Sequence, residues 1–285
     1  MYTALSPGAI GVKADTIEDA ISAAIEGGFQ GVEVNINEVA SRVNSEGASK
    51  VASFFEKAGI RPAAWGLPVE WGGKEESWRK GMEELPRLAH AGAAIGCNRT
   101  MTWITPCSDT LPYDENLQFH IRRFQPIAKA LAEEGCSLGL EFIGPKTSRE
   151  SRRYQFIYRM GEMLEMCREI GSNAGLLLDC WHWYTSEGTI EEILNLQPEQ
   201  VVYVHVNDAP PGVPIDEQMD GVRRLPGATG VIDIAGFLKA LARIGYEGPV
   251  TPEPFYKELY DLESDKDRLG VVRKAMNNIM SALNI

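Results

Sequence analysis

Four ionisable side chains close four successive apolar runs in the second half of the chain. The runs read SLGLEF (137–142), AGLLLD (174–179), VVYVHV (201–206) and GPVTPEPF (248–255), and the ionisable residues are Glu141, Asp179, His205 and Glu253. A strand buried on both faces reads as a near-continuous apolar run, so an ionisable group near its end costs free energy unless a partner compensates it. Four such groups on consecutive strands predict one shared partner, and a divalent cation is the simplest candidate.

Strand-like and helix-like segments alternate about eight times along the chain. This alternation is typical of an α/β protein with a (β/α)8 TIM barrel, and we expect a single domain over residues 1–285. An open Rossmann-like sheet is disfavoured because no GxGxxG turn follows the first strand. The expected strands are 9–14, 31–36, 61–67, 99–105 and the four runs above; the expected helices are 16–27, 43–58, 75–95, 114–134, 155–170, 189–196, 233–244 and 257–282.

Two helix starts and one long loop stand out in this pattern. Asp15 or Thr16 is expected to cap the first helix and Asp233 the seventh, with Gly245 just past the end of the latter. The connection at about 209–229 is long for a βα loop and holds four prolines. Long βα loops are where barrel enzymes keep segments that gate substrate access.

Composition excludes several classes of protein. The chain has 285 residues and a net charge of −12, which opposes binding to nucleic acid because phosphate contacts need clustered Lys and Arg. Its five cysteines show no CxxC spacing, so neither a disulfide framework nor a structural zinc site is indicated. No signal peptide and no membrane span are evident. We therefore expect a reducing, cytoplasmic compartment, no membrane association, and a chain that is free to form a homo-oligomer.

The four strand-end residues form a mixed oxygen and nitrogen donor set. In a barrel, the carboxyl ends of the strands meet at one mouth, so three carboxylates and one imidazole are expected to converge there. Such a set favours manganese, with magnesium, cobalt or zinc as alternatives. Singly, each residue has a plainer role, such as a salt bridge, a buried hydrogen-bonded histidine or a helix cap, but four at matching positions favour a metal site.

The same region resembles a known superfamily. The stretches LGLEFIG, NAGLLLDCWHW, VYVHVND and RLPGATGVID, within about 135–256, are similar to the xylose-isomerase-like sugar isomerases and epimerases. The resemblance is nearest to the inosose isomerase type and weaker to the ketohexose 3-epimerases. It implies a TIM barrel that binds a divalent metal and a small sugar or cyclitol.

The resemblance also assigns residues. It makes Glu141, Asp179, His205 and Glu253 the metal ligands, and it makes His182, in the sequence DCWH, a substrate-binding histidine. Asp208 and Arg223 match polar positions after the seventh strand. One departure concerns the ketohexose 3-epimerases, which place an arginine six residues after the metal histidine. Pro211 stands there in this chain, which leaves Arg223 as the expected contact to substrate.

The expected chemistry is proton abstraction next to a carbonyl through an enediolate, with Glu141 and Glu253 as the catalytic acid and base. This describes an isomerase or epimerase of a keto-sugar or inosose. The alternative is a lyase or dehydratase that eliminates a β substituent at the same site, including cleavage of a carbon-linked glycoside. Remoter alternatives are an abasic-site endonuclease, which needs more than the four histidines present, and a non-catalytic sugar-binding barrel.

Further residues are weaker candidates. Trp65 and Trp103, near strand ends, are expected to wall a sugar ring. Glu33, near the end of the second strand, is expected either to bind a substrate hydroxyl or to form a structural ion pair. Lys146 reads as a solvated lysine by default, with substrate contact as the alternative. His90 and His120 fall in helical segments, and we expect no role in the site for either.

Overall fold

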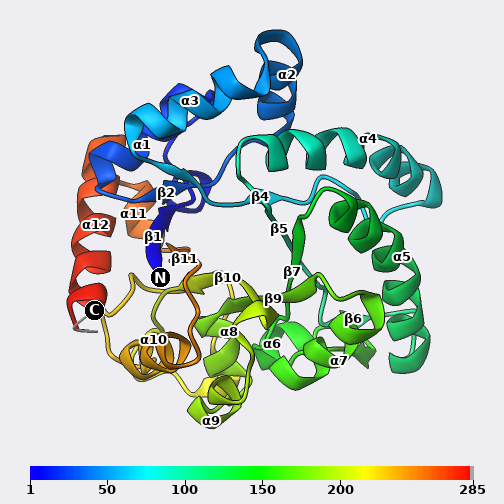
Figure 1. Ribbon diagram of the computed structural model, residues 1–285. Coiled ribbons are helices and arrows are strands. Elements are labelled where there is room, and N and C mark those ends of the chain that lie inside the picture. The colour runs from blue at the N-terminus through cyan, green and yellow to red at the C-terminus, as the bar shows by residue number, and fades with distance from the viewer. Residues whose placement is uncertain (283–285) are drawn as a thin grey trace.

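A ring of parallel strands surrounded by helices forms the molecule (Figure 1). The structure is a computed structural model that describes residues 1–282. Within these residues the main sheet contains nine strands in the order β3-β2-β1-β11-β10-β9-β7-β5-β4. Their bounds are β1 Tyr2–Leu5, β2 Gly31–Val32, β3 Arg61–Pro62, β4 Trp65–Gly66, β5 Arg99–Trp103, β7 Ser137–Glu141, β9 Ala174–Asp179, β10 Val201–Val206 and β11 Pro249–Pro252.

The sheet closes because β3 and β4 are two parts of one extended run. The first part pairs with β2 and the second with β5, so the run joins the two ends of the sheet. Every neighbouring pair is parallel. Counting this run once gives the eight positions of the predicted TIM barrel. A separate antiparallel pair, β6 (Cys107–Ser108) with β8 (Tyr154–Gln155), lies outside the barrel sheet.

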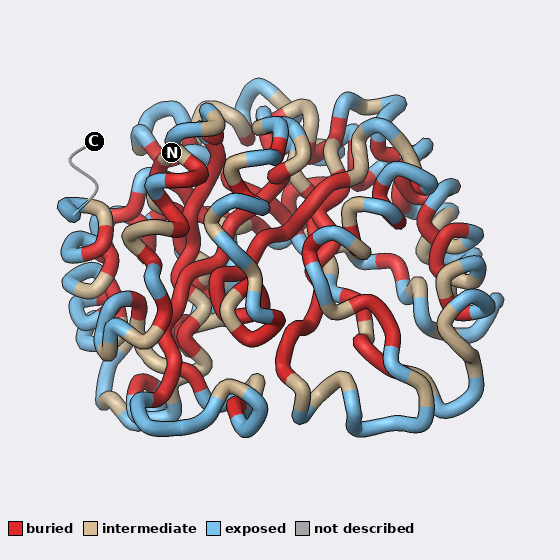
Figure 2. Tube along the Cα trace, turned by 90° about the horizontal axis from the view of Figure 1, so that it is seen from below, coloured by how far each residue is buried: buried red, intermediate tan, exposed pale blue. Residues whose placement is uncertain are grey.

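The helices lie outside the barrel (Figure 1). They are α1 Ile17–Gly27, α2 Ile36–Glu46, α3 Ala48–Ala58, α4 Glu75–Ala94, α5 Tyr113–Glu133, α6 Lys146–Arg149, α7 Met160–Ile170, α8 Cys180–Thr185, α9 Ile190–Leu194, α10 Ile234–Arg243, α11 Lys257–Tyr260 and α12 Asp265–Ser281, with 3₁₀ turns η1 Gly8–Ile10, η2 Pro198–Gln200 and η3 Ile215–Glu217. Buried positions follow the strands and exposed ones the outer helices and loops (Figure 2). None of the helices within residues 1–282 is long and apolar enough to cross a membrane.

The expected first strand at 9–14 is wrong. Residues 8–10 form the turn η1, and Gly11 follows it with a left-handed φ of 71°. The strand at this position of the barrel is β1, which pairs with β2 and β11. The segment MYTAL is too short to stand out as a strand in the sequence, whereas the longer apolar run AIGVKA is broken at Gly11.

The expected helix at 43–58 is two helices. Asn35 caps α2 by accepting hydrogen bonds from the backbone of the first turn, which ends the preceding strand early and starts the helix at Ile36. Gly47, with a φ of 88°, then separates α2 from α3. The expected helices at 155–170 and 257–282 likewise begin with other structure: β8 precedes α7, and α11 precedes α12. The predicted caps Thr16 and Asp233 are confirmed.

Candidate active site

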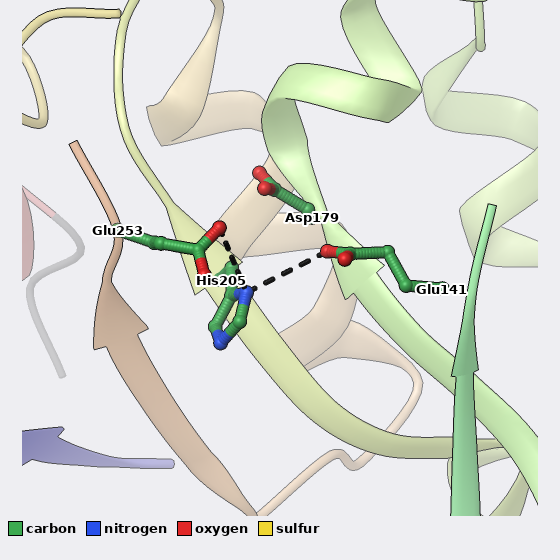
Figure 3. A group of neighbouring side chains, drawn as sticks. All are labelled: Glu141, Asp179, His205 and Glu253. Carbon is green, nitrogen blue, oxygen red and sulfur yellow. Dashed lines mark ion pairs between the residues drawn. The ribbon is translucent and has the colours of Figure 1, made fainter. Parts of the chain in front are cut away.

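The four ionisable residues lie together at one mouth of the barrel (Figure 3). Glu141 and Asp179 are the last residues of β7 and β9, His205 is near the end of β10, and Glu253 follows β11 directly. The strands are parallel and in register, with His205 opposite both Asp179 and Thr251. The predicted convergence follows, because parallel strands that end together present their last side chains to one space.

The ligand cluster is compact and largely buried. One donor atom from each of Glu141, Asp179, His205 and Glu253 lies within 4.8 Å of all the others. The imidazole Nδ1 of His205 is 3.6 Å from Oε1 of Glu141 and 3.4 Å from Oε2 of Glu253. Asp179 is fully buried, and the Glu253 side chain retains 17% of its exposure.

Two atoms at the centre of the ligand cluster have no hydrogen-bond partner among residues 1–282. Oε1 of Glu141 and Nδ1 of His205 are both sealed from solvent, and the separation between them does not give a hydrogen bond. Buried polar atoms are nearly always satisfied in native structures. An orphaned carboxylate oxygen that faces an orphaned imidazole nitrogen, beside two more carboxylates, is a donor set that fits a divalent cation. The four residues can therefore hold a metal ion.

Two hydrogen bonds fix the orientation of the Asp179 carboxylate. Its Oδ1 accepts hydrogen bonds from the backbone N–H of Trp181 at 2.8 Å and from the side-chain amide of Asn207 at 2.9 Å. The bond from Trp181 also caps α8, which starts immediately after the strand. Oδ2 takes no part in these two bonds.

Arg223 enters the ligand cluster from the long loop between β10 and α10. Its guanidinium is 1% exposed and donates from Nη1 to Oδ2 of Asp179 at 2.7 Å and to Oε2 of Glu253 at 3.0 Å, while Nη2 donates to Oδ1 of Asp220 at 2.7 Å. The guanidinium also stacks on the ring of Phe255, 4.6 Å from its centroid. A buried charge persists only when it is paired in this way, so Arg223 ties the long loop to two of the four ligands.

His182, on α8, lies at the edge of the ligand cluster with its ring 1% exposed. Nδ1 lies 3.2 Å from the backbone N–H of Gly144, and Nε2 lies 3.2 Å from Nη2 of Arg223, so two donors face a ring that can accept at only one nitrogen when it is neutral. Nε2 also lies 4.0 Å from Oε1 of Glu141 and 3.8 Å from Oδ1 of Asp220, and His182 lines the cavity. Position 144 must be glycine here, since a Cβ would lie 2.3 Å from the carbonyl oxygen of His182.

The surroundings shift the pKa values of Glu141 and Glu253 in opposite directions. Burial raises the pKa of Glu141, although the neighbouring histidines oppose the rise. Burial acts in the same direction on Glu253, but the charges of His205 and Arg223 outweigh it and hold the pKa of that carboxyl below its usual range. Burial disfavours the charged form of His205, yet Glu253 and Glu141 together raise its pKa well above its ordinary value. The ligand cluster thus attracts positive charge.

A cavity of about 600 Å³ opens at the ligand cluster, within the usual size of small-molecule sites. Glu141 and Glu253 line it together with His182 and Arg223. Trp103, which is 54% exposed, also lines the cavity, and its contact with a sugar ring stays a prediction. The remaining lining residues are Thr105, Pro106, Cys107, Ile143, Thr147, Ser148, Ser151, Arg152, Asp220 and Phe255.

Several of these residues were missed in the sequence. Asp220 gave no signal, because only the folded loop brings its carboxylate onto Arg223. Phe255 did give a signal in the sequence, because it follows the strand-end Glu253 by two residues. Its φ of 37° is unusual for a residue with a side chain, and strained backbone of this kind clusters at functional sites.

Two predicted substrate contacts lie away from the cavity. Trp65 is fully buried and its indole N–H donates to the carbonyl of Cys97, so it packs in the core. Asp208 is also fully buried, and its two oxygens accept hydrogen bonds from four backbone N–H groups, which fixes the loop after β10 instead. Lys146 pairs with Asp216 at 2.8 Å on the outer surface. None of these three residues lines the cavity.

Comparison with known proteins gives one family and several relatives. Residues 21–280 match the family model of the xylose isomerase-like TIM barrel. The inosose isomerase of Halalkalibacterium halodurans is 22% identical over 216 residues, which cover 75% of this chain and 73% of that protein. The 3-dehydroshikimate dehydratase of Pseudomonas aeruginosa is 23% identical over 245 residues, which cover 84% of this chain but only 36% of that longer protein.

Two solved structures share the fold over nearly the whole chain. A xylose isomerase domain protein from Alicyclobacillus acidocaldarius is 28% identical, with a TM-score of 0.86 and 100% of both chains covered. The IOLI protein, solved with a zinc atom, is 18% identical, with a TM-score of 0.78 over 99% of this chain and 98% of that one. The predicted resemblance is confirmed, and the chain belongs to the xylose isomerase-like TIM barrel family.

Proposed function

We propose that this protein is a divalent-metal-dependent isomerase or epimerase that acts on a keto-sugar or an inosose. One observation carries the proposal: Glu141 and Glu253 approach the same point from opposite sides, each within 4 Å of His205 Nδ1, and both line the cavity. The inosose isomerase and dehydratase relatives support an enzyme that works on small hydroxylated substrates.

The four-residue ligand cluster would hold the cation. When bound, a divalent cation polarises a substrate carbonyl and stabilises negative charge on its oxygen. We take manganese as the preferred ion, and the zinc atom bound by the IOLI protein supports a divalent ion in a barrel of this fold.

The residues around the cavity would then transfer the proton and bind the substrate. One of Glu141 and Glu253 removes the proton next to the carbonyl, and the other returns a proton to the adjacent carbon or to the opposite face. His182 lines the cavity and can form a hydrogen bond with a substrate oxygen. The hydroxyls of Thr105, Ser148 and Ser151 line the same cavity and suit a polyhydroxylated substrate. Trp103 offers an exposed ring as its wall.

The test is exchange of carbon-bound hydrogen. We expect wild-type protein with Mn²⁺ to introduce deuterium from D₂O into a ketose or inosose, or into its isomer. The variants Glu141→Gln and Glu253→Gln each keep a carbonyl oxygen but remove the base, so exchange should fall by roughly 10² or more. Glu26→Gln, on the exposed face of α1, is the control for the change of charge. Absence of exchange across a broad panel of keto-sugars would contradict the proposal.

A lyase is the second candidate, favoured by the dehydratase relative. Removal of the same proton leads to elimination when the substrate carries a leaving group on the β carbon. The exchange assay separates the two reactions, because an unsaturated product indicates the lyase and a saturated isomer indicates the isomerase.

A further inference from the structure

A group of polar residues lies next to the ligand cluster without lining the cavity. Tyr203 and Thr251 stand two residues before His205 and Glu253 on the same strands, so they face the same way one layer deeper. Both are fully buried, and their hydroxyl oxygens are 2.6 Å apart. The Tyr203 hydroxyl donates to Oε1 of Glu33 at 3.0 Å, and Ser6 donates to Oε2 of the same carboxylate at 2.7 Å.

Glu33 is a carboxylate without a cation beside it. Within residues 1–282 it makes no ion pair, so the structural ion pair that its sequence position allowed is wrong. Burial raises its pKa, and the charge that opposes this rise most strongly is that of His205. Geometry links this carboxylate to the ligand cluster, because the Tyr203 hydroxyl that donates to Glu33 belongs to a ring that packs against His205.

His205 presents its two nitrogens in opposite directions. Nδ1 points to Glu141 and Glu253, and Nε2 points away from them (Figure 3). An imidazole can offer Nδ1 to a metal only if its proton is on Nε2. Metal-binding histidines almost always donate their second N–H to a carboxylate, a carbonyl or a water, which fixes both the tautomer and the ring orientation.

We propose that Glu33 is a positioning residue for His205: its carboxylate, held by Tyr203 and Ser6, attracts the Nε2–H and so keeps Nδ1 ready for the metal. Tyr203 has two parts in this arrangement. Its hydroxyl fixes Glu33, while its ring packs edge-on against the His205 ring with centroids 5.5 Å apart. Ser6 and Thr251 complete the support, so that the first two strands of the barrel act on a ligand carried by β10. The inference rests on the proposed metal site.

The test measures metal affinity by calorimetric titration of the metal-free protein with Mn²⁺. Glu33→Gln keeps the size and the hydrogen-bonding oxygen but removes the charge, and we expect affinity to fall by about 10- to 100-fold, the usual effect of such a partner. Glu33→Asp keeps the charge and should retain affinity closer to wild type. Tyr203→Phe keeps the ring but removes the hydroxyl, so a smaller loss is expected. The melting temperature of each metal-free variant separates this effect from a loss of folding, and Glu26→Gln controls for net charge.

The outcomes are distinct. Affinity of Glu33→Gln within twofold of wild type overturns the inference and leaves the metal site intact. The same holds if that variant loses turnover at unchanged affinity, because Glu33 then acts on substrate. If Glu33→Gln does not fold, Tyr203→Phe decides, and unchanged Mn²⁺ affinity in it overturns the inference. If wild-type protein itself binds no Mn²⁺, the proposed function fails, and the inference fails with it.

Discussion

Two buried histidines of this chain lie in opposite surroundings. His205, on β10, is 5% exposed and faces Glu141 and Glu253. His120, on α5, is 3% exposed and is packed among the rings of Trp71, Phe119, Phe124 and Phe156, with centroids 4.7–6.3 Å away. Its Nδ1 donates to the carbonyl of Asn116, and its Nε2 has no partner among residues 1–282.

The same burial gives the two rings opposite preferences for charge. Around His205 the carboxylates outweigh the cost of burial and raise its pKa. Around His120 no carboxylate compensates, and burial lowers the pKa to about 4 even though the hydrogen bond to Asn116 opposes the change. The comparison teaches that neighbouring charge decides whether a buried histidine belongs to a cation site or to the core. Each of the following predictions tests one side of it.

The largest effect is expected from His205. His205→Ala removes one of the four ligands, and Mn²⁺ affinity and turnover should each fall by more than about 100-fold, because even residues behind the ligands cost 10- to 100-fold. Calorimetric titration and the exchange assay measure the two losses. His120→Ala is the matched control, a buried histidine whose removal should cost stability and leave Mn²⁺ affinity unchanged. Equal loss of affinity in both variants would break the comparison.

A smaller effect is expected from His182, which lies at the cavity but outside the ligand cluster. His182→Ala should lower kcat/KM by about 10-fold, which corresponds to one hydrogen bond of ~1.4 kcal/mol to substrate. Metal content should stay at the wild-type level, because the ligand set is complete without this ring. Loss of metal from the variant, measured by elemental analysis, would instead place His182 among the ligands.

The pH dependence of stability tests the other side of the comparison. Because the pKa of His120 is about 4 in the folded protein and about 6.5 in the unfolded chain, the unfolded state takes up the proton first as pH falls. The contribution of the neutral ring is therefore complete above pH ~6.5 and is lost between there and pH ~4, by about 3 kcal/mol in total.

Denaturant unfolding of wild type and of His120→Gln across this range isolates the effect, since the amide does not titrate. The difference in unfolding free energy between the two proteins should shrink as pH falls. His90→Gln is the control, because His90 is exposed and pairs with Glu134 on the surface. Parallel pH curves for wild type and His120→Gln would show that His120 does not titrate differently on folding.

The quality of the sequence predictions differs between the two halves of the chain for a physical reason. The strands β7, β9 and β10 are five or six residues long and buried almost throughout, so their apolar runs are legible. In the first half β2, β3 and β4 have two residues each. An apolar pattern so short does not fix where a strand begins and ends in the sequence. The misplaced first strand and the divided helix at 36–58 both belong to this half.

The sequence by itself determined the barrel, the convergence of Glu141, Asp179, His205 and Glu253, and the family. It could do so because strand periodicity and parallel order dictate where strand ends meet. Only the tertiary structure decided that Arg223 reaches two ligands, that Asp208 fixes a loop, that Trp65 packs in the core and that Glu33 accepts a hydrogen bond from Tyr203. These roles depend on which distant segments a side chain meets and which way it points, and no local pattern of residues encodes either.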